Sequence, residues 1–115
     1  MTIFDRMMAS KNWDSRLLRA ISDNIECKKI KFVKPIAYDE IFQDINEDWI
    51  VNFAVNAIIT GCVDKNGKYL ETSKEFEIEV RAHIFLIPEN FPLDSLDAHV
   101  GSMPMKINFH ALRAV

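Results

Sequence analysis

The chain has 115 residues, of which 49% are hydrophobic and 27% charged, and its formal net charge is -3. This length allows one domain, placed over residues 1–115, and it excludes a TIM barrel or a two-domain enzyme. The apolar content, together with only three Gly and four Pro, excludes a disordered linker. The acidic balance argues against a nucleic-acid-binding role, because such proteins contact phosphates through a cationic surface.

The first predicted element is a helix that starts at Asn12 and ends near Cys27. Its apolar side chains recur every four residues, at Trp13, Leu17, Ile21 and Ile25. Asn12 is the expected N-cap, since its side-chain oxygen can accept hydrogen bonds from first-turn amides. Residues 1–11 contain no pattern that sets a register. The apolar stripe of the helix predicts that it covers a sheet.

The helix is followed by a predicted strand from Lys28 to Val33, with Ile30 and Phe32 facing inward. Pro35 then ends regular pairing on that side. Residues 38–48 are expected to form a loop or a short helix. The short helix is favoured by apolar residues that would share one helical face: Tyr38, Ile41, Phe42 and Ile45.

Residues 35–50 hold five acidic side chains and no basic ones. These residues are Asp39, Glu40, Asp44, Glu47 and Asp48. Such a stretch is typical of a solvated connection, and the alternative is an acidic docking surface for a basic partner. The order of residues does not match the D-x-[DN]-x-[DN]-G pattern of a calcium loop, so we expect no metal there.

The strongest pattern in the chain predicts a long hairpin. Apolar residues alternate along Val51–Val63 and along Phe76–Leu86, and residues 64–67 between them are turn formers. Strands of this length are unusual, so we expect the hairpin to be bent or bulged. Pro88 and Pro92 stop the second strand. An irregular segment with one helical turn and a last strand over residues 103–111 complete the chain.

These elements predict an α+β fold, in which the N-terminal helix packs on a four-stranded antiparallel sheet built around the long central hairpin. Several apolar residues fall on the second face of that hairpin, namely Ile50, Ala54, Ile58, Phe85 and Ile87. One helix covers only one face of a sheet. The patch therefore indicates a partner protein, unless residues 1–11 and 35–48 fold over it.

Motifs that carry chemistry are missing from the sequence. It has no phosphate-binding glycine loop and no GxSxG nucleophile, and its three histidines form no short-range metal-ligand pair. The acidic ridge of Glu75, Glu77 and Glu79 is expected to be solvated rather than catalytic. A long-range site made from the cysteines and histidines is an alternative. We predict no catalytic residue, no cofactor and no metal.

The two cysteines, Cys27 and Cys62, are 35 residues apart and form neither a disulfide framework nor a CxxC motif. The first residues do not resemble a signal peptide, and no apolar stretch approaches the ~20 residues that span a bilayer. We therefore expect free, buried thiols, a cytoplasmic location and no membrane contact.

Three stretches, taken in order, resemble the SecB-like export chaperones. They are the hairpin Val51–Val63 with Phe76–Ile87, its Ile84–Ile87 end, and Gly101–Pro104 followed by Ile107–Leu112. The last pair is similar to the family's Gly-x-x-Pro and Asn-Phe-x-Ala-Leu element. The resemblance implies an antiparallel sheet, an oligomer and binding of unfolded chains. The chain opens with a helix where the family has a strand, and it lacks the family's long helices, so no binding residue is carried over.

The sequence thus favours a non-enzymatic protein-binding domain. Its partner would be an unfolded client, as for a SecB-like chaperone that can be a homo-oligomer, or one specific target, as for an immunity protein or a phage-encoded inhibitor. The rival is a small enzyme or ligand-binding domain that uses His83, His110 and a glutamate in a cavity between helix and sheet. The expected protein contacts are Trp49, Phe85, Ile87, Asp39, Glu40, Asp44, Glu47 and Asp48.

Overall fold

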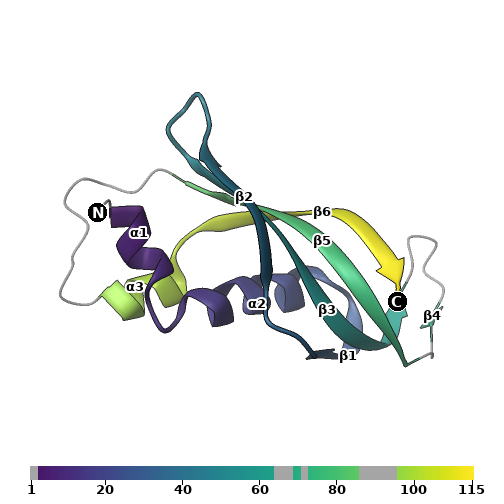
Figure 1. Ribbon diagram of the computed structural model, residues 1–115. Helices are drawn as coiled ribbons and strands as arrows, with labels where there is room; N and C mark the ends of the chain where they lie inside the picture. The colour runs from purple at the N-terminus through teal and green to yellow at the C-terminus, as the bar shows by residue number, and fades with distance from the viewer. Residues whose placement is uncertain (1–2, 64–68, 71–72, 86–95) are drawn as a thin grey trace.

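The computed structural model describes residues 3–63, 69–70, 73–85 and 96–115, and they form an α+β domain (Figure 1). The elements are α1 (Ile3–Met8), α2 (Trp13–Asn24), β1 (Cys27–Phe32), β2 (Ala37–Gln43), β3 (Trp49–Val63), β4 (Tyr69–Leu70), β5 (Lys74–Ile84), α3 (Leu96–Ser102) and β6 (Met105–Ala114). The predicted helix, the two long hairpin strands and the last strand are therefore present. The predicted turn at residues 64–67 lies outside the described residues.

All strands pair antiparallel, in the order β1-β3-β5-β6. Both β1 and β2 pair with β3 and follow one another along it, and the two-residue β4 pairs with its far end. The predicted count of four strands is wrong, because five strands have six residues or more. The additional strand is β2.

The sequence pattern of β2 imitates a helix because the strand contains a bulge at Asp39. Tyr38 lies opposite Phe53, and Ile41 lies opposite Val51, so both occupy positions on the same face of the sheet. A bulge inserts one residue, which turns the usual spacing of two into a spacing of three. The expected loop or short helix over residues 38–48 is therefore wrong up to Gln43, and only residues 44–48 connect β2 to β3.

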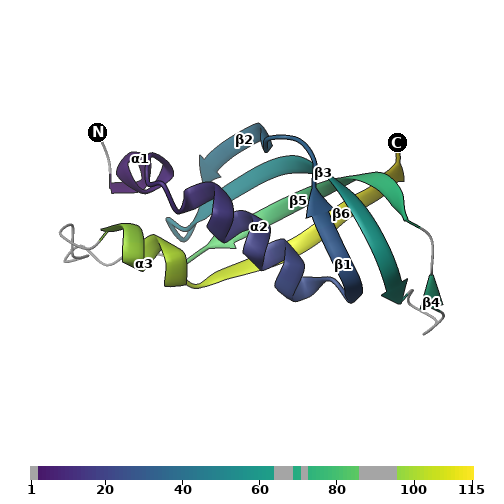
Figure 2. The same cartoon turned by 90° about the horizontal axis from the view of Figure 1, so that it is seen from below.

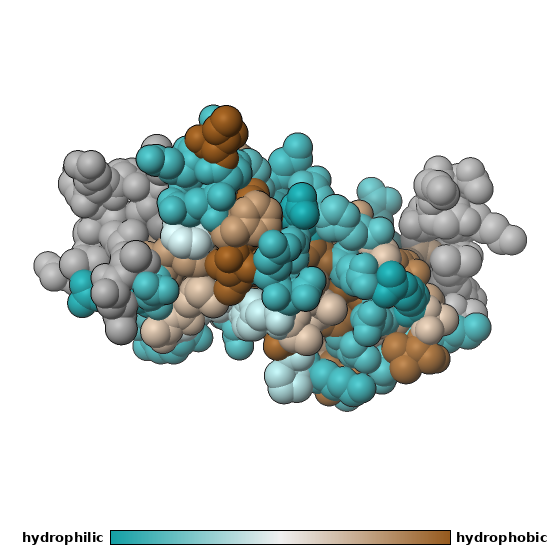
Figure 3. Space-filling model, turned by 45° about the horizontal axis from the view of Figure 1, so that its top comes forward, coloured by the Kyte–Doolittle hydropathy of each residue, from teal (hydrophilic) through white to brown (hydrophobic). Residues whose placement is uncertain are grey.

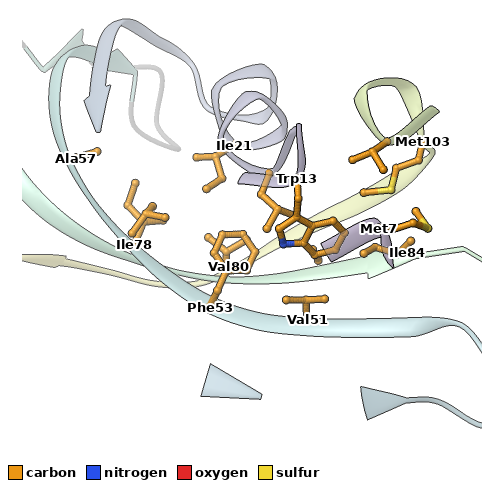
Figure 4. Close-up of a cluster of buried hydrophobic side chains, with 14 of the residues drawn as sticks. Met7, Trp13, Ile21, Val51, Phe53, Ala57, Ile78, Val80, Ile84 and Met103 are labelled. Atoms are coloured by element: carbon orange, nitrogen blue, oxygen red, sulfur yellow. The ribbon is translucent and has the colours of Figure 1, made fainter. Parts of the chain in front are cut away.

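The helices lie on one face of the sheet, and α2 runs across the strands (Figure 2). Trp13, Leu17 and Ile21 of α2 are buried in one cluster with the inward side chains of β3 and β5 (Figure 4). The short α1, which the sequence did not predict, adds Phe4 and Met7 to this core. α1 therefore enlarges the core on the helix side.

The opposite face of the sheet is mainly hydrophilic (Figure 3). Of the apolar residues predicted there, Ile50 is only 7% exposed, because it lies between Phe42 of β2 and His83 of β5. Ala54 and Ile58 are half-buried. Phe85 is 47% exposed, whereas Ile87 lies outside the described residues.

The expected free thiols are wrong, because Cys27 and Cys62 form a disulfide. The two residues are direct partners in the pairing of β1 with β3, with their Cα atoms 3.9 Å apart. Sequence spacing cannot show this, since it depends on strand register. Disulfides persist mainly in oxidising compartments, so the cysteines do not support the expected cytoplasmic location, which stays a prediction.

Two smaller points concern the helices. The expected side-chain cap of α2 by Asn12 is wrong. Asn12 Nδ2 instead donates to the carbonyl oxygen of Asp97 at 2.7 Å, and this hydrogen bond links α2 to α3. Among the described residues, no helix is long and apolar enough to cross a membrane.

Candidate functional site

The loop between β2 and β3 carries three of the predicted contact residues, Asp44, Glu47 and Asp48. The Asp44 side chain accepts hydrogen bonds through Oδ1 from the amides of Asn46 (2.9 Å) and Asp48 (3.0 Å). The Asp44 amide donates to the Asp48 carbonyl oxygen at 2.9 Å and closes the loop. Glu47 has a φ of 66°, a left-handed conformation that costs a non-glycine residue about 1–2 kcal/mol. The three hydrogen bonds together hold the loop in this conformation.

Ile45 stands at the tip of this loop and is 97% exposed. Figure 1 shows that the β2–β3 hairpin projects from the body of the sheet, and Figure 3 shows a hydrophobic projection among hydrophilic neighbours at that end. An isolated exposed isoleucine is common on protein surfaces. Ile45 differs from such a residue in that hydrogen bonds between Asp44 and Asp48 close the loop that presents it.

At the foot of the loop, His83 of β5 faces the two aspartates. Its Nε2 lies 3.0 Å from Asp48 Oδ2 and 3.9 Å from Asp44 Oδ2. All three side chains are partly buried. The imidazole also stacks on the ring of Phe85, with 4.9 Å between ring centroids. We call Asp44, Asp48 and His83 the loop-foot cluster.

The remaining predicted contacts are distributed over both faces. Asp39 and Glu40 are exposed on β2, and Phe85 lies beside the loop-foot cluster. Trp49 is separated from them, since it is half-buried on the helix side and stacks on Phe4 with ring centroids 4.1 Å apart. Trp49 therefore contributes to the core next to α1. The structure brings Asp44, Asp48 and Phe85 together around His83.

A shallow groove of about 670 Å³ lies across β2, β3, β5 and β6. Polar side chains cross its floor: Arg81 Nε donates to Asn52 Oδ1 at 2.9 Å, and Asn52 Nδ2 donates to Glu40 Oε2 at 3.4 Å. His110 lines the groove, but neither His83 nor His99 does. The groove is lined mainly by strand positions that face away from α2, so it differs from the cavity between helix and sheet that the enzyme hypothesis expects. The paired cysteines provide no thiolate for a metal site.

A second exposed region is the edge strand β6. By register, Phe109 lies opposite Val80 and Leu112 opposite Ile78, so both occupy core-facing positions. They are nevertheless exposed, Leu112 to 55%, and the following Val115 is 74% exposed. An extra residue, His110, forms a bulge in β6. Phe109 therefore occupies a core-facing position but remains in contact with solvent, because it lies at the open edge of the sheet.

Comparison of the chain with protein families, with curated proteins and with solved structures found no match. The sequence did contain one signal for the loop-foot cluster. The predicted hairpin places the start of β3 opposite the end of β5, and this pairing brings Asp48 near His83. No short-range spacing links His83 to the acidic residues in the sequence, so the cluster was not predicted.

Proposed function

We propose that this protein is a non-enzymatic protein-binding domain whose β2–β3 loop docks into a folded partner. The observation that carries this proposal is the 97% exposed Ile45 on a loop held by its own hydrogen bonds. A preorganised loop loses little conformational entropy on binding, so more of the interaction energy appears as affinity. An apolar anchor in a polar surround is also typical of binding hot spots.

The charge around Ile45 supports a basic partner. Glu47 is exposed next to it, and Asp39 and Glu40 are exposed further along β2. Complementary charge steers the encounter and rejects partners of the same sign. This arrangement favours the inhibitor or immunity-protein version of the hypothesis, in which one specific target with an apolar pocket and a basic rim is blocked.

The experiment compares two exposed apolar side chains at different sites. Ile45→Ser removes the proposed anchor, and Val115→Ser, at the other end of the domain, is the matched control because its side chain is also largely exposed. Native mass spectrometry identifies the partner that copurifies with the wild type and gives the stoichiometry, expected to be one to one. We expect Ile45→Ser to weaken that complex at least tenfold and Val115→Ser to leave it unchanged.

The proposal fails if both variants bind the partner as tightly as the wild type. Salt provides a second test, because an acidic loop on a basic rim predicts an association rate that falls with rising ionic strength. An association rate that is independent of salt would contradict the charge argument. The role of Ile45 is tested separately, by the comparison of Ile45→Ser with Val115→Ser.

A second candidate function is favoured by β6. Within the part of the chain that the structure describes, β6 pairs with β5 on one side and with no strand on the other, and it carries exposed apolar side chains. An unfolded client could add to this edge as a further strand. Such binding would correspond to a SecB-like holdase. Calorimetry with unrelated unfolded polypeptides distinguishes the two functions: the holdase binds several of them and loses affinity in Leu112→Ser, whereas the specific inhibitor binds none.

A further inference from the structure

The loop-foot cluster places three metal-ligand atoms around one point. The donor atoms of Asp44, Asp48 and His83 all lie within 4.8 Å of one another, and the two distances from His83 Nε2 are 3.0 and 3.9 Å. Ligands of a tetrahedral Zn²⁺ ion lie about 3.3 Å apart, given bonds of about 2.0–2.1 Å. The observed distances bracket this value, so small side-chain rotations would complete the geometry.

The donors are held in place by contacts that an ion would not disturb. Asp44 uses Oδ1 for the amides of Asn46 and Asp48, which leaves Oδ2 directed at His83. The His83 imidazole, on strand β5, is packed on the ring of Phe85. Supporting contacts of this kind orient metal ligands in known sites and increase their affinity.

The charges at the cluster also favour a cation. Among the residues that the structure describes, His83 is the basic side chain within 4.0 Å of either aspartate. Two carboxylates thus share one imidazole, and their like charges repel each other. Partial burial makes this repulsion larger than it would be in bulk water. A divalent ion would balance both charges at once.

We propose that Asp44, Asp48 and His83 bind a divalent transition-metal ion, for which Zn²⁺ is the best match. Nitrogen and carboxylate ligands suit Zn²⁺, whereas Ca²⁺ requires six to eight oxygen ligands and Mg²⁺ prefers an oxygen octahedron. Three protein ligands leave the fourth position to water. The ion ties the loop to β5 across the hairpin. This inference concerns the cluster alone and does not depend on the proposed protein-binding function.

Calorimetric titration of the full chain with ZnCl₂ tests the proposal. We expect one ion per chain for the wild type, and at least tenfold weaker binding for Asp48→Asn and for His83→Gln. The controls are Asp39→Asn and His110→Gln, which remove an exposed carboxylate and an exposed imidazole elsewhere and should leave the affinity unchanged. Titrations with MgCl₂ and CaCl₂ should give binding at least a hundredfold weaker than with ZnCl₂.

A structural readout accompanies the titration. Zn²⁺ should raise the midpoint of thermal unfolding of the wild type and of both controls, because an ion that binds only the folded state stabilises it, and it should not raise that of His83→Gln. Circular dichroism shows whether each variant is folded. If either Asp48→Asn or His83→Gln does not fold, the other one still tests the proposal. The proposal is overturned if the wild type binds no Zn²⁺, or if folded His83→Gln or Asp48→Asn binds it as tightly as the wild type.

Discussion

The edge of the sheet formed by β1 and β2 differs from the edge formed by β6 in how it meets solvent. β1 is linked to β3 by the disulfide between Cys27 and Cys62. β2 contains the bulge at Asp39, and its Tyr38 hydroxyl donates a hydrogen bond to Asp14 of α2. Proline, bulges and charged side chains are the devices that protect sheet edges, and Pro35 and four lysines add to them here.

The β6 edge also has a bulge, at His110, and two basic residues, Lys106 and Arg113, but no disulfide links it to the neighbouring strand. It runs for ten residues, and Arg113 forms ion pairs with Glu77 and Glu79 of β5. These pairs are exposed, and exposed ion pairs contribute at most about 1 kcal/mol. On the other face, Phe109 and Leu112 remain in contact with solvent. An edge of this kind is available for pairing with another chain.

This contrast shows that the two candidate contact regions would bind in different ways. At the end of the protected edge, a hydrogen-bonded loop presents one anchor, which suits a single folded partner. The open edge offers backbone groups and an apolar row, which suits an extended segment of many sequences. Four predictions test how far the difference between the edges extends.

The largest effect is expected at the disulfide. Replacing Cys27 and Cys62 together by serine should lower the free energy of unfolding by about 3–4 kcal/mol, because the bond closes a loop with a sequence separation of 35. Denaturant unfolding measures this. Reductant should destabilise the wild type by a similar amount and leave the double variant unaffected. Two thiols that alkylate in the native, unreduced protein would contradict the prediction.

An intermediate effect is expected at Tyr38. Tyr38→Phe removes the hydrogen bond to the Asp14 carboxylate and should lower the free energy of unfolding by about 1 kcal/mol at neutral pH. If the variant is as stable as the wild type, the link between β2 and α2 contributes nothing, and the protection of this edge depends on the disulfide and the bulge.

The same pair of proteins gives a pH test. Burial, followed by the hydrogen bond and the charge of Asp14, raises the pKa of Tyr38 above its ordinary value of 10.0. The unfolded chain therefore loses this proton first, so the stabilisation is complete below about pH 10 and disappears as the pH rises through the folded pKa. The wild type should lose stability above about pH 10 more steeply than Tyr38→Phe, as measured by urea unfolding at several pH values.

The smallest effect on stability is expected at the open edge. Leu112→Ser should change the free energy of unfolding by less than about 0.5 kcal/mol, since the side chain is largely exposed. It should also reduce the binding of a dye that reports exposed apolar surface. The matched control is Ile78→Ala, the buried residue opposite Leu112 in the sheet, which should cost about 2–5 kcal/mol. A loss for Leu112→Ser comparable to that of Ile78→Ala would mean that this edge is covered in solution.

The elements that could be predicted are those whose pattern is local and uninterrupted. The spacing of Trp13, Leu17 and Ile21 indicated α2, and the alternation along β3 and β5 indicated the hairpin and which residues face inward. Both follow from the periods of helix and strand, 3.6 and 2 residues. α1 was missed because six residues are too few to show a period. β2 was missed because its bulge disrupts the period.

The features of the candidate site also divide into those that the sequence could predict and those that it could not. The sequence marked residues 39–48 as acidic, and the structure places that acidity on a projecting hairpin. Neither the exposure of Ile45 nor the approach of His83 to Asp44 and Asp48 could be inferred from the composition of the loop. The first depends on a loop closed by hydrogen bonds, and the second on strands that meet 35 residues apart in the chain.

The amino-acid sequence by itself determined the α+β class and the long antiparallel hairpin, because burial of apolar residues at a regular period is a local property. Only the tertiary structure decided that two cysteines pair, that β6 leaves apolar side chains in solvent and that three ligand atoms converge at the foot of a loop. These features depend on strand register, and register is set by pairing between distant segments, where a shift of one residue places every side chain on the opposite face.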